Sequence, residues 1–117
     1  VSAFIEDVQS RGLGDQILLV ITGEFGRTPR INKNGGRDHW SNLCPLVFVG
    51  GGLRMGQVIG RSDRNGGAPT SDPIASSSVM ATIMHSLLDV GRLRIATGAS
   101  QEAVSLITAG SPIPQLI

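Results

Sequence analysis

The sequence predicts an α/β fold with a parallel or mixed sheet, and two observations support this prediction. Two continuous apolar runs, "QILLVIT" at 16–22 and "PLVFVG" at 45–50, are typical of strands covered on both faces. Helical patterns precede the first run and follow the second. The order helix, strand, polar loop, strand, glycine loop and helix is that of an α/β layer structure. Because two or three strands cannot form a well-covered parallel sheet alone, we expect further strands upstream of Val1.

The first helix is predicted at the start of the chain. Val1, Phe4, Ile5 and Val8 fall on one face at helical spacing. Gly12 follows at a position where glycine commonly ends a helix. The first apolar strand begins a few residues later.

The second strand ends in a run of glycines. At Gly50, Gly51 and Gly52 we expect the backbone to turn or to approach another segment closely. A short strand is predicted at 56–60. The stretch that follows, 61–73, is rich in turn-forming residues and is predicted to be a loop.

A second helix is predicted from about Ser78 to Asp89. Ser76 or Ser77 is the expected cap, and Gly91 is the expected end. The apolar stripe of this helix is predicted to consist of Met80, Ile83, Met84, Leu87 and Leu88.

A short helix in "SQEAVSLI" and an extended tail, "SPIPQLI", are predicted to complete the chain. The opening residues, "VSAFIEDVQS", resemble the middle of a longer chain and not a signal peptide. We therefore expect residues 1–117 to be a single partial domain.

Composition narrows the classes of function. The chain has 117 residues, 40% of them hydrophobic, and a formal net charge of +1. This charge argues against a general binder of nucleic acid or membrane surfaces. No hydrophobic run approaches the roughly 18–20 residues of a membrane span. Cys44 is the only cysteine, so no internal disulfide can form.

Candidate site residues are concentrated directly after the first apolar strand. Glu24 lies two residues beyond Thr22, and His39 lies shortly before the second strand. In open α/β sheets ligands bind beyond the carboxyl ends of strands, so neighbouring strands would bring both side chains to one edge. A carboxylate and an imidazole together suit a divalent metal ion. Asp38 is either a third ligand or the partner that fixes the tautomer of the His39 ring, and the guanidinium of Arg27 suits an oxyanion.

Each of these residues also has an ordinary structural interpretation. A strand-end Glu commonly caps or forms an ion pair, a His beside a Trp commonly packs, and a loop Arg is commonly solvated. Asp63 lies in a glycine-rich loop, where Asp commonly forms an Asx-turn. His85 is predicted to be a packed or surface residue, and Cys44 a buried structural thiol.

Several motifs resemble a known family. The segments "ITGEFGRTPRIN", "NGGRDHW", "CPLVFVGGGLRMGQVIGRSD" and "GSPIPQLI" resemble the C-terminal part of the domain-of-unknown-function family 1501. That family is similar to sulfatases and belongs to the alkaline phosphatase superfamily. The resemblance covers nearly the whole chain. It implies that residues 1–117 are a C-terminal fragment of an alkaline-phosphatase-like three-layer α/β/α sandwich.

The resemblance also implies roles for individual residues. Superfamily metallohydrolases carry a "T-x-D-H-G" type motif at the end of a strand, and "ITGEFG" occupies that place here. Glu24 matches the metal-binding Asp, and His39 matches a later metal-ligand His. Phe25 stands where relatives have a metal-binding His, so at least one metal position is altered.

The expected function is metal-dependent hydrolysis of phosphate or sulfate esters. The metal is zinc, manganese or calcium, with Glu24, His39 and Asp38 as its candidate ligands and Arg27 as the catalytic anion contact. The nucleophile and the first metal ligand would lie in an N-terminal remainder of the chain, so residues 1–117 alone are expected to be inactive. Because sulfatase-like relatives are often exported, the resemblance alone implies that the protein is periplasmic or secreted.

Two other functions stay open. The first is a non-catalytic module with a degenerate metal site that recognises a polysaccharide or a protein. The second is a self-contained small structural domain, which predicts cooperative unfolding of the chain on its own.

Overall fold

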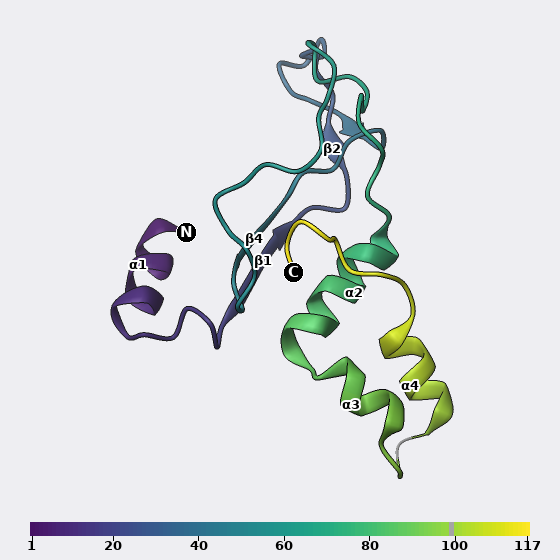
Figure 1. The fold of residues 1–117 in the computed structure, drawn as a ribbon. Helices are drawn as coiled ribbons and strands as arrows, with labels where there is room; N and C mark the ends of the chain where they lie inside the picture. Colours follow the sequence, from purple (N-terminus) through teal and green to yellow (C-terminus); the bar gives the residue numbers. More distant parts are fainter. Residues whose placement is uncertain (99) are drawn as a thin grey trace. The chain divides into compact units, whose positions relative to one another are not determined.

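The computed structural model describes residues 1–98 and 100–117, and in this part of the chain four helices and four short strands follow one another (Figure 1). β1 and β4 are neighbours in one two-stranded sheet, and β2 and β3 form a second. The chain is therefore a mixed α/β protein, as the sequence predicts. The elements are α1 (Ser2–Ser10), β1 (Leu18–Thr22), β2 (Gly26–Arg27), β3 (His39–Trp40), β4 (Leu46–Gly50), α2 (Ser76–Leu87), α3 (Val90–Ile95) and α4 (Gln101–Thr108).

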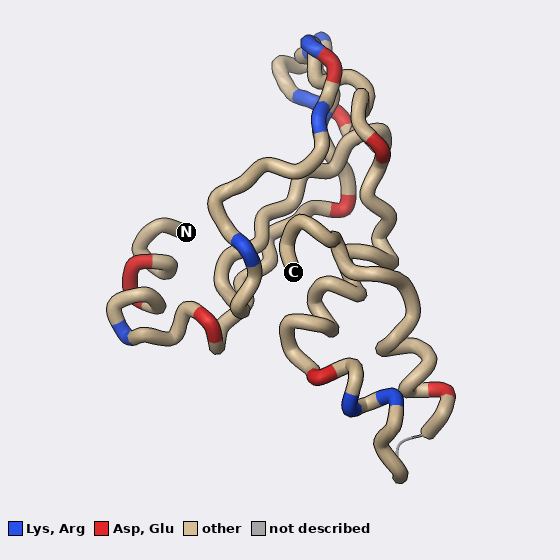
Figure 2. Tube along the Cα trace, in the orientation of Figure 1, with Lys and Arg blue, Asp and Glu red and all other residues tan. Residues whose placement is uncertain are grey.

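The chain is divided into two compact units. The helical unit comprises Val1–Leu18, Val49–Gln57 and Ile74–Ile117, and the loop unit comprises Leu19–Phe48 and Val58–Pro73. The buried hydrophobic side chains among the described residues all belong to the helical unit. They are Val8, Leu53, Ala81, Val90, Val104, Ile113 and Leu116. The loop unit lacks such a core in its described residues and is held by hydrogen-bonded turns, whose loops carry many of the Lys and Arg residues (Figure 2).

The first helix ends as the sequence predicts. Gly12 has a φ of +67°, which L side chains rarely adopt. Its N–H donates to the Gln9 carbonyl at 3.0 Å, and the N–H of Leu13 donates to the Val8 carbonyl at 3.0 Å. These two bonds satisfy carbonyls that the end of α1 would otherwise leave free.

The two predicted apolar strands are present, but they are less covered than expected. Both β1 and β4 lie within the predicted runs. Residues 1–117 do not themselves cover both faces, since Ile21 and Val47 are exposed and no residue of either strand is fully buried. A two-stranded sheet offers few neighbours that could cover these side chains.

The prediction of a third strand at 56–60 is wrong. This stretch has no regular structure, and Val58 is 95% exposed. Gly56 and Gly60 have φ angles of +78° and +86°, which interrupt an extended backbone at both ends.

The second helix begins and ends earlier than predicted. Ala75 is the N-cap residue and makes no side-chain capping bond, so the predicted serine cap is wrong. Leu88 ends the helix in an extended conformation. Gly91, predicted to end α2, lies inside α3, whose N-cap Asp89 accepts a hydrogen bond from the N–H of Arg92 at 3.0 Å.

The buried face of α2 differs from the predicted apolar stripe. Met80 and Leu87 are 51% and 60% exposed, whereas Ala81 and Thr82 are buried. The hydroxyl of Thr82 donates to the Ser78 carbonyl at 2.7 Å and accepts the N–H of Ile113, in the C-terminal tail, at 2.9 Å. The buried side of α2 is therefore the side on which Thr82 is bonded to the tail.

Replacing Thr82 with valine is expected to destabilise the helical unit by about 1–3 kcal/mol. Valine has nearly the same shape, but it leaves the buried N–H of Ile113 without its acceptor. Chemical denaturation of Thr82→Val against Thr82→Ser measures this effect, because serine keeps the hydroxyl. Equal losses of stability in the two variants would show that the methyl group matters and the hydrogen bond does not.

The C-terminal segment is more ordered than predicted. α4 is present as expected, and the side chain of its N-cap Ser100 accepts the N–H of Ala103 at 3.2 Å. α4 packs against α2 and α3. The tail, predicted to be merely extended, buries Ile113 and Leu116, and the carbonyl of Leu116 accepts the N–H of Arg54 at 2.8 Å. In residues 1–98 and 100–117 no helix is both long and apolar enough to cross a membrane.

Candidate functional site

A short antiparallel ladder positions two of the predicted site residues. β2 pairs with β3 so that Gly26 is opposite Trp40 and Arg27 is opposite His39. Directly opposite residues of antiparallel strands are close neighbours. Glu24 lies in the bend between β1 and β2 and is exposed. The loop unit thus brings Arg27 and His39 together.

The hairpin loop, residues 28–38, connects the two strands and is held by internal hydrogen bonds. The side-chain carbonyl of Asn32 accepts the N–H groups of Asn34 and Gly36, both at 3.0 Å. The guanidinium of Arg37 donates to the carbonyls of Thr28 and Pro29 at 2.6 and 2.7 Å. These bonds fold a polar, glycine-containing segment without a hydrophobic core.

Asp38 has a structural role in this loop. Its Oδ1 accepts the side-chain amide of Asn32 at 2.8 Å, and its backbone N–H donates to the hydroxyl of Thr28 at 3.1 Å. In the described part of the chain its carboxylate makes no hydrogen bond to His39. The structure therefore gives Asp38 a loop-stabilising contact in place of the contact that would fix the imidazole tautomer.

A second loop, residues 61–70, is built around Asp63. Its Oδ1 accepts the N–H groups of Asn65 at 3.0 Å and Gly67 at 2.8 Å, and its Oδ2 accepts the N–H of Ala68 at 3.1 Å. The predicted Asx-turn is thereby confirmed. These N–H donors, that of Gly67 most strongly, stabilise the carboxylate and hold the pKa of Asp63 below its ordinary value despite an opposing effect of burial.

The second loop is joined to β3 through Trp40. The indole Nε1 of Trp40 donates to the carbonyl of Gly67 at 2.7 Å, and the amide of Asn42 reaches the same carbonyl at 3.4 Å. Asp63 therefore fixes the backbone at Gly67. Trp40, the residue next to His39, is bound to that backbone. This contact is not predictable from the sequence, because its only signal is a Trp and an Asx-turn 23 residues later in the chain.

Acidification is expected to loosen the second loop. Because the pKa of Asp63 is lower in the folded state, its carboxylate contributes stability that is present above the unfolded-state pKa, about 4. That contribution is lost as the pH falls through the lower, folded-state pKa. NMR signals of the Gly67 and Ala68 amides should therefore shift in a transition with a midpoint below roughly pH 4. Asp63→Asn should remove the transition, and a midpoint at or above the ordinary value would contradict this assignment.

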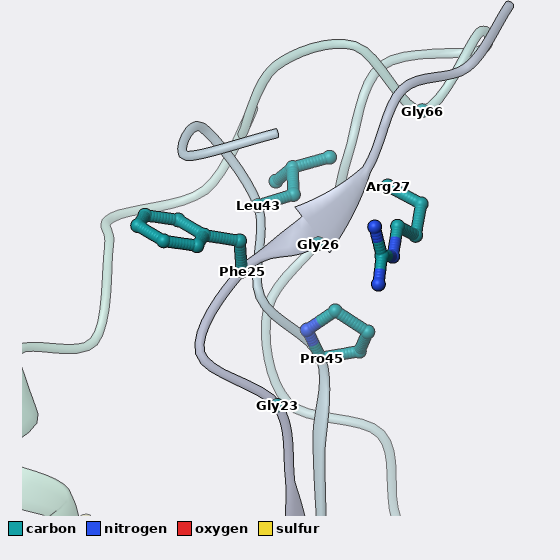
Figure 3. A pocket seen from close by; sticks show the side chains of 7 residues that line it. All are labelled: Gly23, Phe25, Gly26, Arg27, Leu43, Pro45 and Gly66. Atoms are coloured by element: carbon teal, nitrogen blue, oxygen red, sulfur yellow. The ribbon is translucent and has the colours of Figure 1, made fainter. Parts of the chain in front are cut away.

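An open pocket of about 410 Å³ lies in the loop unit (Figure 3). Figure 3 shows Arg27 and Pro45 on one side of β2 and Phe25 on the other. The pocket places a cation beside apolar side chains and glycine backbone. Its lining consists of Gly23, Phe25, Gly26, Arg27, Leu43, Pro45 and Gly66.

The His39 ring is stacked against Phe25. The two ring centroids are 5.4 Å apart, and the rings are inclined by 30°. This contact covers part of one face of the imidazole but leaves His39 exposed. Coordination of a metal uses a ring nitrogen in the plane of the imidazole, so the stacking is compatible with it.

The predicted metal ligands do not converge in the described residues. Nowhere in 1–98 or 100–117 do three His, Cys, Asp or Glu side chains form a group that could hold a metal ion. Glu24 and His39 alone are too few ligands for a structural or catalytic metal site. The described residues therefore do not form a complete metal site by themselves.

Two further predicted roles have different outcomes. Cys44, expected to be buried, is exposed, and its Sγ lies 3.1 Å from the carbonyl of Gly23. The short stretch before β4 leaves no layer of side chains to cover the thiol. His85 is half-buried on α2, in agreement with the expected packed or surface position.

The fold and this site define a mixed α/β protein with a polar, cationic loop site following its first strand. Residues 1–117 match the family described as protein of unknown function DUF1501, and the chain belongs to that family. No curated protein and no solved structure matches the chain.

Proposed function

We propose that the chain is the C-terminal part of a metal-dependent hydrolase that acts on phosphate or sulfate esters. In this proposal the full-length protein is sulfatase-like and has the three-layer α/β/α sandwich of the alkaline phosphatase superfamily. The observation that carries the proposal is the pairing of Arg27 with His39 across β2 and β3, one bend after Glu24.

Arg27 is the anion contact of the proposed site. Its guanidinium presents a planar set of donors that matches the oxygens of a phosphate or sulfate group. It lines the pocket, and within the described residues its side chain makes no hydrogen bond or ion pair that would occupy these donors. An ester held there would lie at the residue of β2 that pairs with His39 of β3.

Glu24 and His39 are the proposed metal ligands. A divalent ion, zinc, manganese or calcium, would polarise the ester and activate the attacking group when bound. Because the described residues supply too few ligands, the proposal requires further ligands and the nucleophile from outside residues 1–117. Asp38 contributes by fixing the hairpin loop through Asn32.

A metal titration of the full-length protein tests the proposal. Glu24→Ala and His39→Ala should each weaken binding of Zn²⁺ or Mn²⁺ by more than about tenfold, since even changes to groups behind the ligands cost tenfold or more. His85→Ala is the matched control, because it removes the other histidine, which lies on α2. Metal binding that is unchanged in both site variants would remove Glu24 and His39 as ligands.

One observation favours the alternative of a non-catalytic binding module. Phe25 occupies the position of a metal-binding His in superfamily relatives and is itself stacked on His39. In a module of this kind the Phe25–His39 pair is a packing contact and the pocket binds its partner without a metal. Stoichiometric metal binding that depends on Glu24 and His39 excludes this alternative.

A further inference from the structure

We propose that the loop unit carries an extended binding surface for a sulfated polysaccharide, with the pocket at Arg27 as one end of it. We call this surface the cationic rim. It consists of Arg27, Arg30 and Lys33 on and beside the hairpin loop, and Arg61 and Arg64 on the second loop. The choice of a sulfated substrate rests on the proposed function, but the binding itself does not require catalysis.

The loop unit contains more basic than acidic residues. Six of the ten Lys and Arg residues lie in the loop unit, against four of the nine Asp and Glu residues. Two of those acids are held inside their own loops: Asp38 accepts the amide of Asn32, and Asp63 accepts three backbone N–H groups. The other two are Glu24 and Asp72.

The cations, in contrast, are free to bind a ligand. All five side chains of the cationic rim are exposed, and in the part of the chain that the structure describes none of them makes a hydrogen bond or an ion pair. Arg37 is the exception among the loop cations, because its guanidinium is bound to two carbonyls. The loop unit therefore carries more cations than acids, and this net positive charge attracts anions.

The second loop is bonded to the strand pair that carries the hairpin loop, so the proposed surface spans both loops. The bond between the Trp40 indole and the Gly67 carbonyl joins the second loop to β3. Gly66 and Arg27 line the same pocket, and Arg64 is two residues from Gly66. Figure 2 shows several Lys and Arg positions on the loops of this unit. A ligand with several regularly spaced anionic groups can contact both loops at once, and linked contacts of this kind add to its affinity.

The aromatic side chains favour a polysaccharide over single-stranded nucleic acid. Nucleic-acid channels stack successive bases on several aromatic rings. In the loop unit Phe25, 48% exposed, is the one Phe or Trp side chain that is largely accessible, since Trp40 and Phe48 are half-buried. A single exposed ring in the pocket that Arg27 also lines suits one sugar of an anionic chain, with its sulfates on the guanidinium groups.

Binding of dextran sulfate, with uncharged dextran and oligo-dT as comparison ligands, tests this surface. The measurement is made with EDTA present, so that it does not depend on the proposed metal site. We expect dextran sulfate to bind with a strong dependence on salt, uncharged dextran not to bind, and oligo-dT to bind more weakly. Lys33→Ala/Arg64→Ala should lower the affinity for dextran sulfate about tenfold at low salt and flatten the salt dependence.

The matched control removes two exposed cations from the helical unit. Arg54→Ala/Arg92→Ala changes the net charge by the same amount but lies outside the cationic rim. Equal losses in the two double variants, equal binding of dextran and dextran sulfate, or tighter binding of oligo-dT would each overturn the proposal. Lys33→Glu provides a second test, since a reversed charge should weaken binding more than Lys33→Ala. A loss of metal binding with intact dextran sulfate binding, or the reverse, separates this surface from the proposed hydrolase site.

Discussion

Gly26→Ala is expected to destabilise the loop unit by about 3 kcal/mol or more and to abolish the β2–β3 ladder. A Cβ at this position would overlap the backbone carbonyl oxygen of Leu43 and would approach the Trp40 carbonyl to 3.3 Å. Both obstacles are backbone atoms, which cannot move aside as a side chain can. Native domains are stable by only about 5–15 kcal/mol, so this loss is large. Chemical denaturation, together with NMR signals of His39 and Trp40, measures it.

Gly36→Ala is the matched control for this prediction. Gly36 is in the hairpin loop, has no positive φ, and a Cβ there would meet only the Asn32 side chain at 3.8 Å. Its replacement should change stability by less than about 1 kcal/mol. Similar losses in the two variants would mean that the loop tolerates no substitution for a general reason and that the close approach at Gly26 is not the cause.

The need for glycine at position 26 also explains how the pocket is formed. Leu43 can pass directly over β2 only because Gly26 has no side chain. This approach forms one wall of the pocket, which Leu43 lines together with Pro45, Arg27 and Phe25. Gly26, in "EFGRTP", thus helps to shape the pocket through its lack of a side chain.

The sequence predicts well those elements whose signals are local. The helical spacing before Gly12 needs no other segment to be interpreted, and α1 ends there as predicted. The two apolar runs are strands, because their residues favour extended backbone in many contexts. The buried side of α2 was not predictable in this way, since Thr82 on that side is bonded to Ile113, 31 residues away in the chain.

The same distinction applies to the candidate site. The polar segment after β1 indicates a candidate site because charges and glycines follow directly on a strand, and the structure does bring Arg27 opposite His39. A metal centre, however, needs the convergence of several ligands, which spacing along one loop cannot establish. The contacts that hold the loops, Asn32 with Asp38 and Trp40 with Gly67, join residues with no characteristic motif.

Gly50→Ala is expected to destabilise the helical unit by about 3 kcal/mol or more. Gly50 has a φ of +79°, and this conformation alone costs an L side chain about 1–2 kcal/mol. A Cβ would also overlap the carbonyl oxygen of Ile17 and lie 2.5 Å from that of Gly14. The carbonyls of Gly14 and Ile17 accept the N–H of Gly51 at 2.9 and 3.0 Å, so the collision would break the bonds that close this turn.

Gly52→Ala separates the cost of the positive φ from the cost of the close contact with backbone carbonyls. Gly52 has a similar φ of +71°, but nothing lies within 4 Å of a Cβ built there. Its replacement should therefore cost only the conformational part, about 1–2 kcal/mol. Thermal and chemical denaturation of the two variants measures the difference, which is the contribution of the close approach between the glycine turn and the segment that leads into β1. If both variants lose the same stability, the positive φ explains the whole effect, and the tight contact with Gly14 and Ile17 contributes nothing.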